Sequence, residues 1–107
     1  METHLMLGNE AVARGAWEAG VQVAAAYPGT PSTEILTNLA RYDGVYAEWS
    51  TNEKVAYEVA FGAAMGGVRA LTAMKSAGAS VAADPLISSV YTGICGGLVV
   101  ILSLIHI

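Results

Sequence analysis

The sequence contains a single cysteine, Cys95, among its 107 residues. One thiol cannot form a disulfide within the chain, supply a four-thiolate zinc site or hold an iron–sulfur cluster, because each of these needs several cysteines. Any such redox centre is therefore expected outside this sequence. Cys95 lies among glycines, with no neighbouring His or Lys to activate it, and we expect it to be a small buried thiol.

Positive charge and long apolar runs are also scarce. Five basic and nine acidic residues give a net charge of −4, which leaves no basic surface for a nucleic acid. The longest apolar run, residues 98–107, is about half the roughly 20 residues of a membrane helix, and we expect a buried strand that continues to the chain end. The start, Met1-Glu2-Thr3-His4, lacks a secretory signal, so a cytoplasmic location without membrane partners is expected.

What the chain does contain is a hydrophobic fraction of 54%, with 19 Ala and 12 Gly, which is typical of one globular domain. Helical and strand periodicities alternate along it. Helices are predicted at residues 9–19, 31–41, 51–66 and across 79–92, and strands at 21–26, 45–49, 68–74 and 98–107. This alternation predicts an α/β fold, an open parallel sheet with helices on both faces. Asn9 and Thr30 are the expected N-caps of the first two helices.

The segment 27–34, Tyr-Pro-Gly-Thr-Pro-Ser-Thr-Glu, follows the first predicted strand and precedes a helix. Ligands bind at this position in open α/β sheets. Its hydroxyl groups and free backbone N–H groups predict an anion pocket for the acid group of a substrate. The alternative is that Thr30 only caps the helix while the prolines shape the turn, and the pattern alone favours that alternative.

The second candidate site follows the second strand. Ser50 and Glu53 have the spacing of a capping box, in which each side chain accepts a hydrogen bond from a backbone N–H group at the helix start. The alternative is that Glu53 points into a pocket and exchanges a proton with a cofactor. Spacing alone favours the capping box.

Other candidates are weaker. Lys75 is predicted at the carboxyl edge of its strand and could face a ligand, although a solvated lysine is commoner. His4 and His106 lack a third ligand at metal spacing, so no metal site is predicted. Trp17 and Trp49 are expected to be packing residues, and Lys54 and Glu58 a surface pair.

Several motifs occur together in order: residues 7–16, 27–35, 52–67, 72–75 and 81–85. Over roughly residues 5–101 the sequence resembles the start of the alpha subunit of indolepyruvate ferredoxin oxidoreductase. This resemblance implies a thiamine diphosphate-dependent enzyme and assigns residues 1–107 to the amino-terminal part of its pyrimidine-binding domain. The implied reaction is oxidative decarboxylation of an aryl pyruvate, with transfer of the acyl group to coenzyme A and of electrons to ferredoxin.

The resemblance also implies roles for individual residues. Glu53 matches the glutamate that contacts the ring nitrogen of the cofactor's aminopyrimidine and supports its proton transfer. Thr30 matches a threonine near the substrate carboxylate, and Tyr27, Pro28 and Gly29 join Glu53 as cofactor-binding residues. Mg²⁺ and the 4Fe-4S clusters are expected in the remainder of the subunit, and a beta subunit, ferredoxin and coenzyme A are the implied partners, so these 107 residues alone are expected to be inactive.

Two departures from the family pattern bear on these expectations. Ser76-Ala77-Gly78-Ala79-Ser80 lacks the histidine expected soon after the Met-Lys pair, which leaves another 2-keto acid open as the substrate. Residues 103–107 do not continue the match and are interpreted as a non-native or truncated tail of an incomplete domain. A non-catalytic α/β binding module, in which Thr30 and Glu53 only cap helices, is the remaining alternative.

Overall fold

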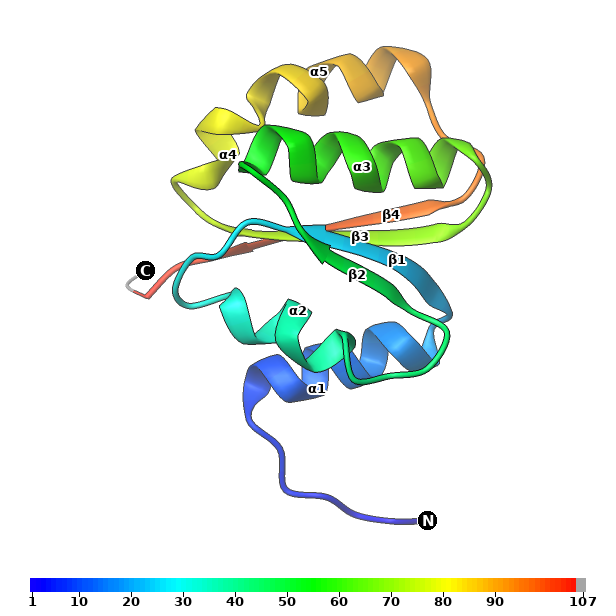
Figure 1. Cartoon of the computed structure of the whole chain (residues 1–107), viewed down its shortest axis with the longest axis vertical. Helices are drawn as coiled ribbons and strands as arrows, with labels where there is room; N and C mark the ends of the chain where they lie inside the picture. The colour runs from blue at the N-terminus through cyan, green and yellow to red at the C-terminus, as the bar shows by residue number, and fades with distance from the viewer. Residues whose placement is uncertain (106–107) are drawn as a thin grey trace.

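A computed structural model describes residues 1–105 of the chain. Five helices and four strands alternate along it (Figure 1). Their bounds are α1 Gly8–Glu18, β1 Val21–Ala26, α2 Thr33–Leu39, β2 Tyr46–Trp49, α3 Glu53–Met65, β3 Arg69–Lys75, α4 Gly78–Val81, α5 Ala83–Thr92 and β4 Gly97–Ser103. The predicted alternation is confirmed, and Pro85 lies in the first turn of α5, where a missing N–H group is tolerated.

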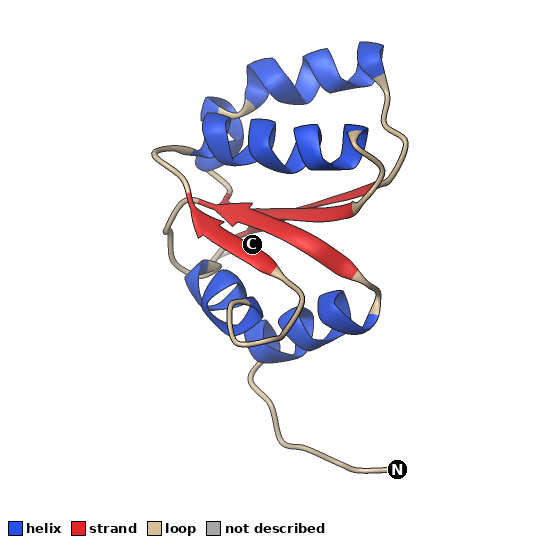
Figure 2. Cartoon of the chain, turned by 45° about the vertical axis from the view of Figure 1, so that its right-hand side comes forward, coloured by secondary structure: helices blue, strands red, loops and turns tan. Residues whose placement is uncertain are grey.

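The four strands form one parallel sheet in the order β2-β1-β3-β4. Ala24 of β1 is in register with Ala47 of β2 on one side and with Leu71 of β3 on the other. Helices α1 and α2 cover one face, and α3, α4 and α5 cover the other (Figures 1 and 2). The predicted open parallel sheet with helices on both faces is therefore confirmed.

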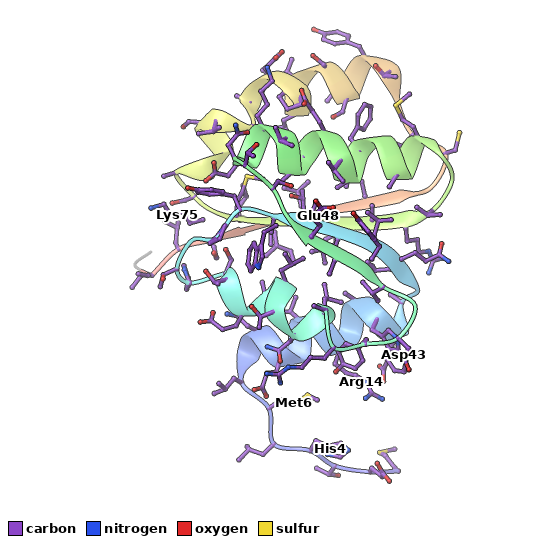
Figure 3. All side chains as sticks on the ribbon, in the orientation of Figure 1. His4, Met6, Arg14, Asp43, Glu48 and Lys75 are labelled. Atoms are coloured by element: carbon purple, nitrogen blue, oxygen red, sulfur yellow. The ribbon has the colours of Figure 1, made fainter. Side chains whose placement is uncertain are left out.

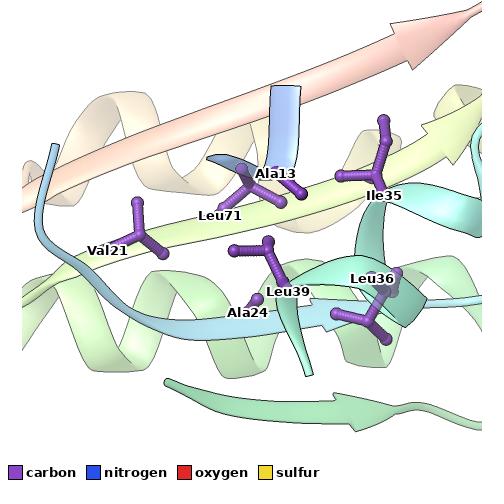
Figure 4. Packing of buried hydrophobic residues seen from close by; sticks show 9 residues of the cluster. Ala13, Val21, Ala24, Ile35, Leu36, Leu39 and Leu71 are labelled. Carbon is purple, nitrogen blue, oxygen red and sulfur yellow. The ribbon is translucent and has the colours of Figure 1, made fainter. Parts of the chain in front are cut away.

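Larger aliphatic side chains fill the face under α1 and α2. Ile35, Leu36 and Leu39 of α2 are at most 2% exposed and pack against Leu71 of β3 (Figure 4). Ala13 of α1 completes this cluster. Burial of these side chains contributes roughly 1.5–3 kcal/mol each, so α2 and the sheet centre carry much of the hydrophobic stabilisation.

Alanines line the opposite face. Ala56, Ala60 and Ala64 of α3 are fully buried and recur at a four-residue interval. The smaller side chain lets the helix axis approach the strands more closely than a leucine would. Val59 of the same helix is 40% exposed, whereas Tyr57 lies on the buried face with the alanines.

Helix starts differ from the predicted caps. Helix α1 begins at Gly8, after Leu7, so Asn9 is already helical. The Asn9 amide donates instead to the carbonyl oxygen of Pro31 at 2.6 Å and to Oε2 of Glu34 at 3.0 Å. Asn9 therefore joins α1 to the segment after β1, a long-range contact that local spacing does not reveal.

The carboxyl-terminal expectations also need correction. Strand β4 ends at Ser103 and lies at the edge of the sheet, where Val99 and Leu102 are about half exposed, so it is neither fully buried nor continuous to the chain end. Cys95 is exposed, because it lies in the surface connection between α5 and β4. His106 and Ile107 lie outside the described residues.

The helices within residues 1–105 all fall short of the length and hydropathy that a membrane-spanning helix requires. This finding concerns the described part of the chain.

Leu39→Ala should lower the free energy of unfolding by roughly 2–5 kcal/mol, because it opens a cavity beside Leu71 and Val21. Leu5→Ala is the matched control, since Leu5 is fully exposed and its truncation should change stability by less than about 0.5 kcal/mol. Urea unfolding followed by circular dichroism measures both. Equal changes in the free energy of unfolding for the two variants would contradict the burial of Leu39 in the core.

Candidate functional site

Three neighbouring strands place the candidate residues at one edge of the sheet. Strands β1, β2 and β3 are adjacent and parallel, so their carboxyl ends share an edge. Residues 27–32 follow β1, residues 50–52 follow β2, and Lys75 ends β3. The backbone N–H of Ser50 donates to the carbonyl oxygen of Ala26 at 2.8 Å, which joins the first two segments directly. The two sites predicted separately from sequence thus form one candidate site.

The segment after β1 is held by its own hydrogen bonds. The Gly29 N–H donates to the Thr33 hydroxyl at 3.0 Å, while the Ser32 N–H and hydroxyl donate to the Gly29 carbonyl at 2.9 and 3.0 Å. The peptide bond between Thr30 and Pro31 is cis. Tyr27, Pro28 and Thr30 remain exposed on this ordered segment, where a ligand can reach them.

The capping interpretation of Thr30 is wrong. Helix α2 begins at Thr33, with Ser32 as the residue before it, so Thr30 lies outside the cap position. None of the hydrogen bonds within residues 1–105 engages the Thr30 side chain, and its hydroxyl can therefore bind a ligand.

Lys75 lies beside this segment, at the carboxyl end of β3 (Figure 3). Its side-chain stem packs on Gly29: a Cβ built at Gly29 would lie 3.4 Å from both Cγ and Cδ of Lys75. Lys75 is exposed, and its ammonium group takes part in none of the ion pairs formed within residues 1–105. The contact places the stem of a basic side chain against Gly29, the residue before Thr30.

Helix α3 is capped by a residue that the sequence reading passed over. Asn52 is the N-cap, and its side-chain oxygen accepts a hydrogen bond from the Val55 N–H at 2.9 Å. Glu53 is the first helical residue, so the capping box of Ser50 and Glu53 is wrong. Since Asn52 satisfies the helix start, the Glu53 carboxylate is free for another role.

The residue Glu53 is largely buried. It is 9% exposed and continues the buried stripe of α3 at the spacing Glu53, Ala56, Tyr57, Ala60. No hydrogen bond or ion pair to the Glu53 carboxylate occurs within the described part of the chain. The α3 N-terminus favours negative charge there. The Glu53 oxygens are not fully enclosed, because the Thr72 hydroxyl is the one fully buried side-chain polar atom without a hydrogen-bond partner within residues 1–105. An accessible carboxylate on an otherwise buried side chain, bound by no group of the described chain, is a candidate for ligand binding.

Two contacts hold α5 against α3. Lys54 pairs with Asp84 at 3.1 Å rather than with Glu58 as expected, and this hydrogen bond to Asp84 raises the pKa of the Lys54 ammonium. Both side chains are exposed, so the pair contributes little stability. The Tyr57 hydroxyl and the Ser89 hydroxyl are 2.7 Å apart, and Ser89 donates onward to the Leu86 carbonyl.

The remaining candidates do not join the site. His4 contacts only the exposed Glu2 at 3.3 Å, and residues 1–105 contain no group of three His, Cys, Asp or Glu side chains suited to a metal. Trp17 stacks on Tyr42 with ring centroids 4.9 Å apart, as expected of a packing residue, while its exposure of 36% is close to the 40% of Trp49 at the end of β2.

Sequence reasoning missed one residue of the site, Gly78, the first residue of α4. Gly78 is buried against the Glu53 side chain. A Cβ atom added at Gly78 would lie 2.7 Å from Cγ of Glu53. Nothing in the local pattern around Gly78 signals this contact.

Residues 14–101 match the family described as pyruvate flavodoxin/ferredoxin oxidoreductase, thiamine diphosphate-binding. The chain belongs to this family. The match includes all four strands up to Ile101 and every candidate residue at the common edge. A site at this edge is therefore part of a family domain whose description names a cofactor.

Relatives of this family include the indolepyruvate oxidoreductase subunit IorA of Thermococcus kodakarensis, which is 54% identical over 105 residues. That comparison covers 95% of this chain and 16% of the relative. The 2-oxoglutarate synthase subunit KorA of Archaeoglobus fulgidus is 39% identical over 85 residues, or 76% of this chain and 24% of the relative. The chain thus spans about one sixth of the IorA relative's length.

A solved structure shares the fold. The 2-oxoglutarate:ferredoxin oxidoreductase from Magnetococcus marinus, with 2-oxoglutarate, coenzyme A and succinyl-CoA bound, superposes with a TM-score of 0.69 and 29% identity. The superposition covers 71% of this chain and 14% of that protein. It supports the parallel α/β fold of the chain.

Asn52→Ala should lower the free energy of unfolding by about 1 kcal/mol, because the Val55 N–H loses its side-chain acceptor. Ser50→Ala is the control and should have a smaller effect, since Asn52, not Ser50, caps α3. Chemical denaturation of both variants distinguishes the two caps. A larger loss of stability for Ser50→Ala than for Asn52→Ala would contradict Asn52 as the cap and support the capping box of Ser50 and Glu53.

Proposed function

We propose that the chain is part of a thiamine diphosphate-dependent indolepyruvate:ferredoxin oxidoreductase. In this reaction the bond between the keto carbon and the carboxylate breaks and CO₂ leaves. Two electrons then reduce ferredoxin, and the acyl group joins the sulfur of coenzyme A. The observation that carries the proposal is the largely buried Glu53 at the common edge, whose carboxylate has no hydrogen-bond or ion-pair partner within residues 1–105, in a domain of a thiamine diphosphate-binding family. The identity of 54% to a subunit named for indolepyruvate supports the substrate class.

The residues present fit the cofactor. When bound, thiamine diphosphate supplies the nucleophilic carbon for attack on a 2-keto acid. Glu53 offers a carboxyl oxygen that can share a proton with a ring nitrogen of the aminopyrimidine, and a buried site strengthens that interaction. Tyr27, Pro28 and Gly29 follow the adjacent strand β1 at the same edge, with the Gly29 N–H donating to the Thr33 hydroxyl. We assign proton transfer to Glu53 and ring positioning to residues 27–29.

Thr30 and Lys75 are the proposed partners of the substrate carboxylate. The Thr30 hydroxyl is exposed and outside the helix cap, and Lys75 packs on the adjacent Gly29. A hydroxyl donor and an ammonium group on neighbouring strands can bind one carboxylate together. The segment 76–80 after Lys75 is proposed to influence which 2-keto acid binds.

The other parts of the reaction are proposed to lie outside this sequence. Its single cysteine cannot hold an iron–sulfur cluster, and residues 1–105 contain no group of three His, Cys, Asp or Glu side chains placed to hold a metal ion. We therefore propose that the remainder of the subunit and a beta subunit supply the 4Fe-4S clusters, the Mg²⁺ site and the contacts with ferredoxin and coenzyme A.

Glu53→Gln should reduce turnover by about 10²-fold or more, because an amide cannot exchange the proton. The test uses a full-length chimera in which these residues replace the matching segment of the Thermococcus kodakarensis subunit. Ferredoxin reduction with indolepyruvate is measured, and the melting temperature should change little.

Glu58→Gln is the matched control, since Glu58 lies on the exposed side of the same helix. It should leave turnover unchanged. Normal turnover of Glu53→Gln would refute the assignment and favour a non-catalytic module, as would an unmodified chimera without activity.

Thr30→Val in the same chimera should raise the KM for indolepyruvate about tenfold with a smaller change in kcat, because a hydrogen bond to the carboxylate is lost. Thr37→Val is the control, because Thr37 bonds only within α2. Steady-state kinetics with indolepyruvate and 2-oxoglutarate measure the effect. If the KM of Thr30→Val equals that of Thr37→Val, the proposed role of Thr30 in binding the substrate carboxylate is wrong.

A further inference from the structure

Gly78 makes room for the side chain of Glu53. A Cβ added at Gly78 would lie 2.7 Å from Cγ, 3.0 Å from Oε1 and 3.1 Å from Cδ of Glu53. These distances are shorter than van der Waals contact, so any other residue at position 78 would occupy space that Glu53 now fills. The two residues follow different strands, Glu53 after β2 and Gly78 after β3.

Other glycines of the described chain have different surroundings. A Cβ at Gly15 or Gly62 would meet nothing within 4 Å, and one at Gly29 would meet Lys75 at an ordinary 3.4 Å. At Gly96 a Cβ would collide with backbone, 2.1 Å from the Val68 carbonyl oxygen. Within residues 1–105, Gly78 is therefore the glycine whose missing Cβ accommodates the carboxylate side chain of the site.

The backbone at Gly78 is held in place from both sides. The Ser76 N–H donates to the Ser103 carbonyl at 2.9 Å, which fixes the start of the segment to β4. The Ala82 N–H donates to the Gly78 carbonyl at 3.0 Å, and the following α5 is joined to α3 by Lys54 with Asp84 and by Tyr57 with Ser89. A collision is therefore relieved more easily by rotation of the Glu53 side chain than by movement of the backbone.

We propose that Gly78 is a positioning residue for Glu53. Its backbone, which has no side chain, lies against Glu53 and keeps the carboxylate directed into the site, where no hydrogen bond within residues 1–105 does so. This inference rests on the proposed function of Glu53. A methyl group at position 78 turns the Glu53 side chain away while the fold persists, and a displacement of about 1 Å in a reacting group can reduce the rate about 10²-fold.

The first test is a pair of crystal structures of the full-length chimera, unmodified and with Gly78→Ala. We expect the Glu53 side chain to adopt another rotamer in the variant, with the backbone of residues 76–82 unchanged. Glu53 in its original position beside a shifted backbone would overturn the proposal. This measurement does not depend on catalysis, so it stays decisive for the contact even if the proposed reaction is wrong.

The second test is kinetic. Gly78→Ala should lower kcat about 10²-fold with little change in the KM for indolepyruvate, and it should cause no further loss when added to Glu53→Gln, because both act through the same carboxylate. Gly62→Ala is the control, with open space around its Cβ, and should leave kcat unchanged. Additive losses, or normal kcat in Gly78→Ala, would overturn the positioning role.

If Gly78→Ala does not fold, the double variant with Glu53→Ala is examined by thermal unfolding. Truncation of Glu53 removes the colliding Cγ, so the double variant should fold. Failure of the double variant as well would show that Gly78 serves the backbone alone and would overturn the proposal. If Glu53→Gln keeps full activity while the Glu53 side chain is rotated in Gly78→Ala, the proposed function is refuted. The inferred contact between Gly78 and Glu53 is then still supported.

Discussion

Close packing of α3 on the sheet determines the direction of Glu53. Ala56, Ala60 and Ala64 are fully buried on one side of the helix, and the helical repeat extends that side to Glu53 in the first turn. The same packing that buries the alanines therefore carries a carboxylate into a protected place at the carboxyl edge of three strands. Asn52 satisfies the helix start, and Gly78 leaves the space that the carboxylate needs.

The high alanine content affects both the stability of the fold and the geometry of the site. Small side chains bury less area than Leu or Ile, so α3 gains less hydrophobic stabilisation per residue than α2 does. Because these side chains are small, the helix lies close to the strands, and the segments after β1, β2 and β3 remain near one another. Larger core residues such as Leu36, Leu39 and Leu71 are concentrated on the opposite face. Stability and site geometry thus depend mainly on different faces of one sheet.

The fold was predictable because its signals are local. Short apolar runs such as Val21–Ala26, alternating with helical periodicity, indicated every strand and the parallel sheet. The caps were not predictable, because Ser50, Thr51 and Asn52 are all competent caps and the backbone path from β2 selects Asn52. Candidate residues Thr30 and Glu53 were found through motif resemblance, whereas Gly78 was missed because its contact with Glu53 forms only when β2 and β3 lie in one sheet.

The central claim is that the Glu53 carboxylate, which has no hydrogen-bond or ion-pair partner within residues 1–105, binds the cofactor. A crystal structure of the full-length chimera with thiamine diphosphate bound tests this claim most directly. We expect a Glu53 carboxyl oxygen within hydrogen-bond distance of the aminopyrimidine ring nitrogen, with the side chain against Gly78. An aminopyrimidine whose ring nitrogen faces another group, with Glu53 contacting only protein or water, would contradict it.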